Sequence, residues 1–444
     1  MSEFLVSIFQ TPAIMLGLVA LIGLILQGSK PSAVFSGTVK TAIGMIMLSA
    51  GSGLIVSYIT PFSELFTSVF NISGFATSSE SVSASMQTAV PVVGTTSALI
   101  LALGFLVNVL LARFSPLKYI FLTGHMMWIL SVVVAYVLYT MGLGEVPTII
   151  LGSIIQGLVM ITLPAIAQPL VRKVTNSDMF AIGHLTTLGT VLSGWVGGLV
   201  GDRTKSAEDM KLPESLEFFK DTSMSVSIVM GVFYLVLVIG AGPEAVDAYS
   251  GGTVNYVMFG ILQALGFTVG ILVLLQGVRL FLGELVPAFK GISDKLVPGA
   301  IPALDVPALF GFAPNSLMLG FIGAVIGMLV AMVVSAAAFQ AVPLVSIIGA
   351  FFTGGVAGIF GNATGGRRGA AVSGFVYGFV LIFFSAFVFT LYDFAAVGAG
   401  GVGHDCVDVM AFLALMKVPA LGIGIIVAAF VGMCILETRR TKGR

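Results

Sequence analysis

Long apolar runs alternate with short polar segments along almost the whole chain, and this pattern predicts a polytopic α-helical membrane protein. A helix needs about 20 consecutive apolar residues to cross a hydrocarbon core of about 30 Å. Eleven segments come close enough to this length, at residues 12–29, 37–59, 95–112, 118–141, 147–170, 222–242, 254–282, 316–335, 342–362, 370–392 and 414–436. We therefore expect an all-α fold with about 11 transmembrane helices.

The distribution of basic residues agrees with this number of spans. If the C-terminal tail is cytoplasmic, eleven crossings put the N-terminus outside, and 19 of the 20 Lys and Arg residues then fall on the cytoplasmic side, with Lys417 as the exception. Basic residues of membrane proteins collect on that side. We predict a multi-pass protein of the inner (cytoplasmic) membrane, with its N-terminus outside and its C-terminus in the cytoplasm.

Three further stretches are apolar or weakly polar but are broken by Gly, Pro or polar residues, at 61–94, 178–200 and 299–315. Non-helical backbone at membrane depth is tolerated only where it is buried in protein or lines a wet cavity. Broken segments of this kind are the best indication that a sequence gives of a transporter's binding site. We predict re-entrant or broken segments in these places.

The chain divides into two halves around a short charged connector. Five spans lie in a first half (about 1–200), the cytoplasmic connector occupies 202–221, five spans lie in a second half (about 222–393), and an extra helix follows at 414–436. Two five-span halves must have opposite orientations in the membrane, so an inverted repeat is expected. The connector is too short for an enzymatic domain. Residues 1–444 are therefore interpreted as one integral membrane unit.

The composition excludes several classes of protein. Hydrophobic residues make up 57% of the chain and charged residues 9%, with a mean hydropathy of +1.10. Soluble domains contain about 25% charged residues. A formal net charge of zero leaves no basic face for nucleic acid, and two cysteines exclude a disulfide framework or a Cys-rich metal site. We expect no cofactor, no metal and no catalytic residue. The N-terminus lacks the basic region of a cleavable signal and is interpreted as mature protein.

Few ionisable residues remain once the polar loops are set aside. They are His125, His184 and Asp305, the last lying between Pro302 and Pro307. An ionised group at the centre of a membrane helix costs about 2.5–3.5 kcal/mol or more, so such residues are candidates for function. A carboxylate accepts hydrogen bonds and a neutral imidazole both donates and accepts them, which suits a ligand rich in hydroxyl groups. The alternatives are packing roles for the histidines and a backbone-capping role for Asp305.

Several longer motifs are also familiar. They are GTVKTAIGMIMLSAGSGLI (37–55), LTGHMM (122–127), FAIGH (180–184), EDMKLPESLEFFKD (208–221), QGVRLFLGELVPAFKGISDKLVPGAIPALD (276–305), FAPNS (312–316) and FGNATGGRRGA (360–370). In order and spacing these motifs resemble the ascorbate-specific membrane component, EIIC, of the bacterial phosphotransferase system. The resemblance extends from near the N-terminus to the tenth span.

The resemblance implies a transporter and not an enzyme. It implies an eleven-span homodimer with a substrate-holding core domain, a dimer-forming domain and an elevator-like motion. The substrate, L-ascorbate or a related sugar, polyol or sugar acid, would be phosphorylated on the cytoplasmic side by a separate EIIB protein that is itself supplied by EIIA. The sequence contains neither an EIIA nor an EIIB domain.

The resemblance also implies a substrate site. It maps onto His125, Met126, Met127, Trp128, Ile129, His184, Leu185, Asp305, Ser79 and Glu80. The two histidines and Asp305 match the family pattern. Ile129 and Leu185 stand where the ascorbate carriers have glutamine, and Glu80 stands where they have an aromatic residue. These three departures leave open a sugar acid or polyol other than ascorbate.

Two alternatives remain from the residues themselves. A secondary active transporter could use Asp305 or a histidine to couple transport to protons. Arg367 and Arg368 are most simply orientation signals, but they could also meet a partner protein or a phosphate.

Overall fold

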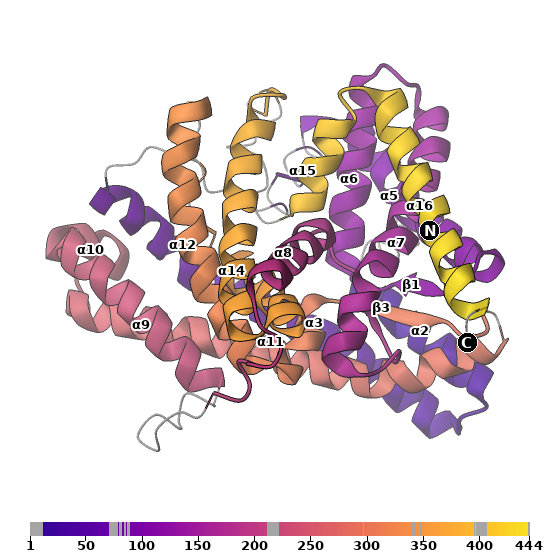
Figure 1. Cartoon of the computed structure of the whole chain (residues 1–444), viewed down its shortest axis with the longest axis horizontal. Helices are drawn as coiled ribbons and strands as arrows, with labels where there is room; N and C mark the ends of the chain where they lie inside the picture. The colour runs from indigo at the N-terminus through magenta and orange to yellow at the C-terminus, as the bar shows by residue number, and fades with distance from the viewer. Residues whose placement is uncertain are drawn as a thin grey trace.

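The structure is a computed structural model of the whole chain, and it is mostly helical, as the sequence predicts (Figure 1). It describes residues 12–70, 89–210, 222–295, 297–339, 349–394 and 406–442, together with residues 79, 82–83, 86, 343, 345–346 and 396. Glu80 and residues 211–221 of the predicted connector lie outside the described residues.

One group of helices contains the two longest helices, and we call it the long-helix group. It consists of α2 (Pro12–Gln27), α3 (Pro31–Phe70), α9 (Thr222–Ala241), α10 (Pro243–Ser250) and α11 (Tyr256–Lys295). α11 packs along α2, α3 and α9, and in Figure 1 it runs along the lower part of the molecule. Apolar side chains supply most of this packing because the helices are apolar on nearly every face.

The second group surrounds a small sheet, and we call it the sheet group. It consists of α5 (Pro91–Phe114), β1 (Tyr119–Phe121), α6 (Gly124–Thr140), α7 (Glu145–Thr175), β2 (Ala181–Ile182), α8 (Thr187–Val200), β3 (Ile301–Leu304), the 3₁₀ helix η2 (Val306–Phe312), α12 (Pro314–Phe339), the π-helical turn η3 (Ala350–Gly354), α14 (Gly355–Phe389), α15 (Val407–Leu415) and α16 (Pro419–Lys442). α7 packs against α5, α6 and α16, while α8 and α12 pack against α14.

The three strands form a parallel sheet in the order β1-β3-β2. An open sheet edge would leave backbone groups unpaired inside a membrane protein. Here the fully buried amide of Asn108 covers the edge of β1, donating to the Tyr119 carbonyl (3.1 Å) and accepting from the Phe121 N–H (3.0 Å). Gln168 donates to the Phe180 carbonyl next to β2 (3.2 Å). Side chains of α5 and α7 thus replace the missing neighbouring strands.

The positions of the three strands contradict one predicted span and confirm that two of the apolar stretches are interrupted. Residues 118–141 were expected to form a single helix, but β1 occupies the beginning of that segment and α6 begins at Gly124. The interrupted stretches 178–200 and 299–315 contain β2 and β3. Most of the third, 61–94, lies outside the described residues beyond the end of α3.

α14 is not a straight helix, because the chain turns back at Gly365–Gly366, where the second glycine has a φ of +62°. A Cβ added at Gly361 would collide with the Ser373 hydroxyl oxygen. In a continuous helix these two residues would be about 18 Å apart. The two arms correspond to the predicted spans 342–362 and 370–392. The sequence places the turn between these spans at Arg367 and Arg368.

The part of the connector that the structure describes is tied to this turn and to α12. The Arg203 guanidinium donates to the Thr364 carbonyl (2.8 Å). Glu208 accepts hydrogen bonds from the N–H groups of Asn315 (3.2 Å) and Ser316 (2.8 Å) in the first turn of α12. A carboxylate in this position satisfies free N–H groups and complements the helix dipole.

Within the described residues, six helices are long and apolar enough to cross a membrane, or seven if the bent pair α9 and α10 counts as one span. α6 and α8 are apolar but shorter, at 17 and 14 residues. The multi-pass membrane character is therefore confirmed, whereas eleven spans and an inverted repeat stay predictions.

Candidate functional site

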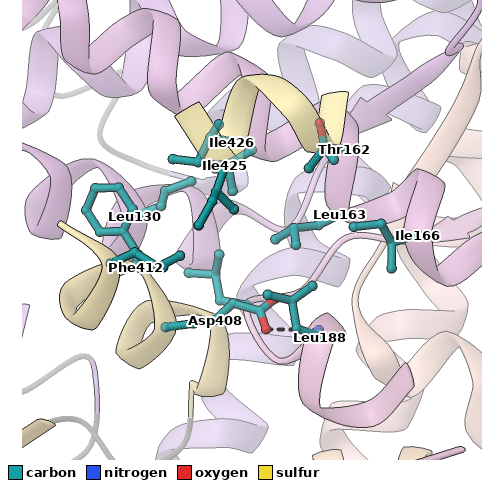
Figure 2. A pocket seen from close by; sticks show the side chains of 14 residues that line it. Leu130, Thr162, Leu163, Ile166, Leu188, Asp408, Phe412, Ile425 and Ile426 are labelled. Atoms are coloured by element: carbon teal, nitrogen blue, oxygen red, sulfur yellow. Dashed lines mark hydrogen bonds between the residues drawn. The ribbon is translucent and has the colours of Figure 1, made fainter. Parts of the chain in front are cut away.

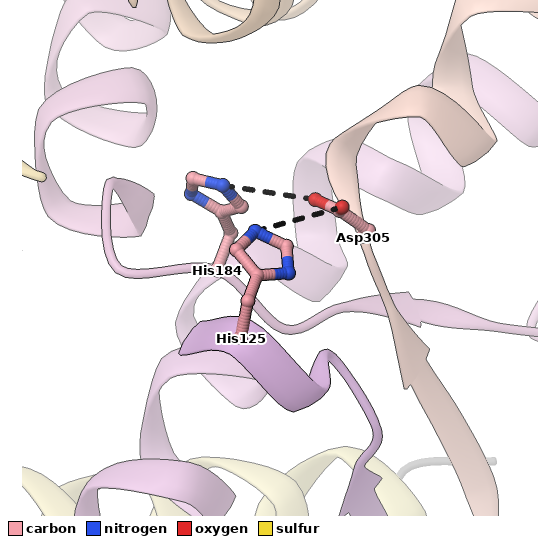
Figure 3. Close-up of side chains that lie close together, drawn as sticks. All are labelled: His125, His184 and Asp305. Carbon is pink, nitrogen blue, oxygen red and sulfur yellow. Dashed lines mark ion pairs between the residues drawn. The ribbon is translucent and has the colours of Figure 1, made fainter. Parts of the chain in front are cut away.

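The three ionisable residues that the sequence singles out meet at one edge of the sheet (Figure 3). Asp305 directly follows β3, His184 lies two residues after β2, and His125 lies four residues after β1. Parallel strands in register end at the same edge, and the pairs Phe121 with Ala303 and Ile182 with Leu304 set that register. The sheet is therefore the element that brings these three distant segments together.

The three side chains, called the triad below, face one another across gaps slightly longer than hydrogen bonds. Asp305 Oδ1 lies 3.6 Å from His184 Nε2, and Asp305 Oδ2 lies 4.0 Å from His125 Nε2. The imidazole rings stand edge to face with their centroids 6.3 Å apart. A direct N–H···O bond would measure about 2.7–3.2 Å. The spacing leaves the facing atoms able to bond to a polar group placed between them.

Other contacts fix which triad atoms face the centre. His184 Nδ1 is paired with the Thr186 hydroxyl at 2.9 Å, so its Nε2 is the nitrogen turned to Asp305. Asp305 Oδ1 accepts the N–H of Val306 (2.7 Å) and thereby caps η2, which leaves Oδ2 without a short bond within the described residues. The capping role and the binding role proposed for Asp305 are thus compatible, because separate oxygens serve them.

The three triad side chains differ in their exposure. The His184 and Asp305 side chains are 6% and 10% exposed, whereas that of His125 is 27% exposed. A small ligand could therefore approach over His125 and exchange hydrogen bonds with a carboxylate and two imidazoles. Groups of this kind donate to and accept from hydroxyl groups.

Two imidazoles and a carboxylate could also hold a transition metal. Their ligand atoms all lie within 4.8 Å of one another. Metal–nitrogen bonds of about 2.0–2.1 Å would require closer ligand atoms than the observed gaps, so the side chains would have to move inward. The observed spacing suits a bridging hydroxyl group better.

The other predicted site residues surround the first turn of α6 and the turn before α8. Met126 and Met127 are buried and Trp128 is half-buried. Ile129 and Leu185 are completely buried. Ser79 is buried, and no contact with the triad is described for it.

Leu185 lines an apolar cavity of about 150 Å³ between α6, α7, α8, α15 and α16 (Figure 2). Two of its lining residues are polar, Thr162 and Asp408. The Asp408 carboxylate does not point freely into the cavity, because its two oxygens accept the N–H groups of Thr187 and Leu188, each at 2.9 Å. Asp408 therefore caps α8 directly after the turn that carries His184.

A further cluster anchors the loop before β2 from the outside of the bundle. The Asp178 carboxylate accepts hydrogen bonds from Arg172 and Gln168, and Arg440 of α16 lies 3.5 Å away. Burial alone would raise the pKa of Asp178, but these hydrogen bonds and positive charges hold that pKa below its usual range. The loop thus joins α7, β2 and α16.

Sequence reasoning missed Asn108, Gln168 and Asp408 as supports of the site. A signal existed for the two amides, since each is a polar residue inside a predicted span. The charge pattern placed Asp408 in an outside segment, and no local signal indicates its contact with α8, 220 residues earlier in the chain.

Comparison with known proteins gives two matches. The family model of the sugar-specific permease component of the phosphotransferase system (PTS) matches residues 7–415. The chain is also 30% identical over 440 residues to the ascorbate-specific PTS system EIIC component of Mycoplasma pneumoniae. That alignment covers 86% of this chain and 66% of the relative, so the chain spans about two thirds of the relative's length.

Proposed function

Because the chain belongs to the family of sugar-specific permease components of the PTS, we propose that it carries L-ascorbate, or a closely related sugar acid or polyol, across the membrane. In this role it is a transporter and not an enzyme. The transported molecule is phosphorylated on the cytoplasmic side by a separate EIIB protein, which receives its phosphoryl group from EIIA.

The triad is the observation that carries this proposal. Three side chains able to exchange hydrogen bonds with hydroxyl groups converge where non-helical segments end, and a gap of 3.6–4.0 Å separates their facing atoms. Binding sites of carriers are built at such broken segments. We further propose that Met126, Met127, Trp128 and Ser79 contact the substrate, as the family pattern implies.

Ascorbate is the preferred candidate for two reasons. The Mycoplasma pneumoniae relative is named as ascorbate-specific, and ascorbate is a small molecule with several hydroxyl groups. Two of the departures from the ascorbate pattern, Ile129 and Leu185, affect positions that contribute apolar contact. Ile129 and Leu185 are fully buried, and Leu185 faces the apolar cavity in part. The triad then supplies the principal polar contacts of the substrate.

The division into two groups of helices supports an elevator-like transport cycle. All three triad residues belong to the sheet group. Within the described residues, the main contacts of this group with the long-helix group are those of α2 with α6 and of α11 with β3 and η2. In the proposed cycle the sheet group moves with its substrate, and the long-helix group stays fixed and forms the homodimer. The chain crosses the bacterial inner membrane eleven times, with its N-terminus outside.

The basic surface at the α14 turn is the proposed docking site for EIIB. Arg203, Lys205, Arg367 and Arg368 are all exposed there. The Arg367 N–H donates to the Lys205 carbonyl (2.8 Å), so the two segments present their charges together. A cluster of arginines suits a phosphorylated partner, because guanidinium groups bind phosphate through paired hydrogen bonds.

Uptake of labelled ascorbate tests the proposal in cells with and without the cognate EIIB. We expect accumulation of phosphorylated substrate that requires EIIB. Uptake of unmodified substrate into proteoliposomes under a proton gradient alone would instead favour a proton-coupled transporter. Absence of ascorbate binding by the purified protein would exclude ascorbate, and a panel of sugar acids and polyols would then identify the substrate class.

A further inference from the structure

Thr186 is the N-cap residue of α8, but its hydroxyl group does not cap the helix. A threonine at this position ordinarily accepts the N–H of the second or third helical residue. Here the carboxylate of Asp408 accepts the N–H groups of Thr187 and Leu188 instead, each at 2.9 Å. A side chain from a distant segment thus leaves the Thr186 hydroxyl available for another partner.

That partner is the imidazole ring of His184. Thr186 Oγ1 lies 2.9 Å from His184 Nδ1, both residues are buried, and the hydroxyl has no other hydrogen-bond partner within the described residues. The neighbouring Thr187 hydroxyl donates to the His184 carbonyl (2.7 Å). Two consecutive threonines therefore hold the same histidine, one by its backbone and the other by its ring.

Asp305 decides which of the two atoms, Thr186 Oγ1 or His184 Nδ1, is the donor. Asp305 Oδ1 accepts the Val306 N–H (2.7 Å) and faces His184 Nε2 at 3.6 Å (Figure 3). A neutral imidazole donates from one nitrogen and accepts at the other. An unprotonated Nε2 would turn its lone pair towards an oxygen that is itself an acceptor, and the two would repel each other. The proton therefore belongs on Nε2, and Nδ1 must accept from the Thr186 O–H.

We propose that Thr186 is a positioning residue of the triad, whose hydroxyl group donates to His184 Nδ1 and so keeps the proton of the neutral ring on Nε2, facing Asp305. The inference rests on the proposed function and deepens it. A substrate hydroxyl group between these two side chains then has one orientation, in which its oxygen accepts from His184 and its proton is donated to Asp305. Thr186 acts through His184 and does not touch the substrate.

NMR spectroscopy of the substrate-free protein tests the position of the proton. The chain contains three histidines, His125, His184 and His404, so ¹⁵N labelling of histidine alone gives a simple spectrum, and His184→Asn identifies the His184 signals by their loss. In the wild type we expect a neutral His184 ring with its proton on Nε2.

Thr186→Val removes the donor to Nδ1. It should shift the His184 Nδ1 signal and lower the ascorbate affinity, measured by calorimetric titration, by about 2- to 12-fold, the range for one neutral hydrogen bond. Thr186→Ser keeps a hydroxyl group in the same place and should restore both the signal and the affinity.

The chain offers a matched control in Thr190, which lies one helical turn further along α8. Thr190 is 2% exposed, and its hydroxyl donates to the carbonyls of Thr186 and Thr187, each at 3.1 Å. Thr190→Val thus removes a buried hydroxyl from the same helix without removing a contact of the ring. The His184 signals and the ascorbate affinity should stay unchanged.

Three results would overturn the role of Thr186. They are a protonated Nδ1 in the wild type, unaltered His184 signals or unaltered affinity in Thr186→Val, and equal changes in Thr190→Val. The first result needs no variant to fold. If the wild type binds neither ascorbate nor any other sugar acid, the proposed function fails, and the wild-type spectrum still decides where the proton lies. Ascorbate binding by a protein with its His184 proton on Nδ1 would remove only the role of Thr186.

Discussion

The sheet group and the long-helix group differ in how their backbones are held together. In the sheet group, amide side chains cover strand edges, and carboxylates cap helix starts, as Asp408 does for α8 and Glu208 for α12. In the long-helix group the helices meet mainly through apolar side chains, with isolated polar links such as Lys40 to Glu284. The difference teaches that geometry precise enough for a small ligand depends on directional contacts, and these tie together more of the described backbone in the sheet group than in the long-helix group.

The largest expected effect comes from Asp305→Asn. The amide oxygen can still cap η2, so the fold should persist, but the charged acceptor for substrate hydroxyl groups is lost. Hydrogen bonds to charged groups contribute about 1.5–3 kcal/mol each, so we expect ascorbate affinity to fall by about 10- to 150-fold. Glu284→Gln in the long-helix group serves as the control and should bind normally. Equal affinities of the two variants in a calorimetric titration would show that the triad does not bind the substrate.

Replacing a glycine by alanine should destabilise the protein in the sheet group but not in the long-helix group. A Cβ at Gly374 of α14 would collide with the backbone of Gly320 in α12, whereas a Cβ at Gly231 of α9 meets nothing within 4 Å. Overpacking costs about 1–3 kcal/mol or more, so Gly374→Ala should lower the Tm by several degrees. Gly231→Ala should be neutral or slightly stabilising, because alanine is the better helix former. Similar melting temperatures would contradict the closer backbone packing of the sheet group.

Removal of the α8 cap should have an intermediate effect on both stability and binding. Asp408→Ala leaves the N–H groups of Thr187 and Leu188 without this acceptor. We expect a loss of about 1–2 kcal/mol of stability with weaker ascorbate binding, because His184 lies on the capped turn. Asp408→Asn should lose less, since its amide oxygen still accepts. The exposed Asp247 of α10 provides the control variant Asp247→Asn. Thermal denaturation combined with titration measures both effects, and an inert Asp408→Ala would mean that the cap does not position His184.

The smallest effect is expected for the ion pair of the long-helix group. Lys40 Nζ lies 2.9 Å from Glu284 Oε1, and the two side chains are 50% and 26% exposed. Pairs this exposed contribute less than about 1 kcal/mol, and salt weakens them further. Lys40→Met should therefore change the Tm by little, and less at high salt. A loss exceeding that of Asp408→Ala would reverse the comparison between the groups.

The sequence predicts the triad because ionisable residues are rare in this chain. His184 and Asp305 lie in broken apolar segments, and His125 lies near the start of a predicted span. It predicts the turn at Arg367 and Arg368 because basic residues interrupt an apolar run. It does not predict β1, because the short apolar segment 119–121 has no periodicity that separates a strand from the start of a helix.

The polar supports are harder to predict than the triad. The contact of Asp408 with α8 and that of Glu208 with α12 join residues more than 100 positions apart. Such pairings follow from the arrangement of the helices and not from any local pattern. The amides of Asn108 and Gln168 are visible in the sequence as polar residues within spans, but their partners are backbone groups, which look alike at every position.

The strand order has a consequence for biosynthesis. β3 lies between β1 and β2, yet the ribosome makes it last, long after the other two. β1 and β2 do not pair with each other, so the sheet cannot form while only the first half of the chain has been synthesised. It forms after the second half has supplied β3, which pairs with both. The triad is therefore completed at a late stage of synthesis, and two separately expressed half-chains should regain ascorbate binding only when they are produced together.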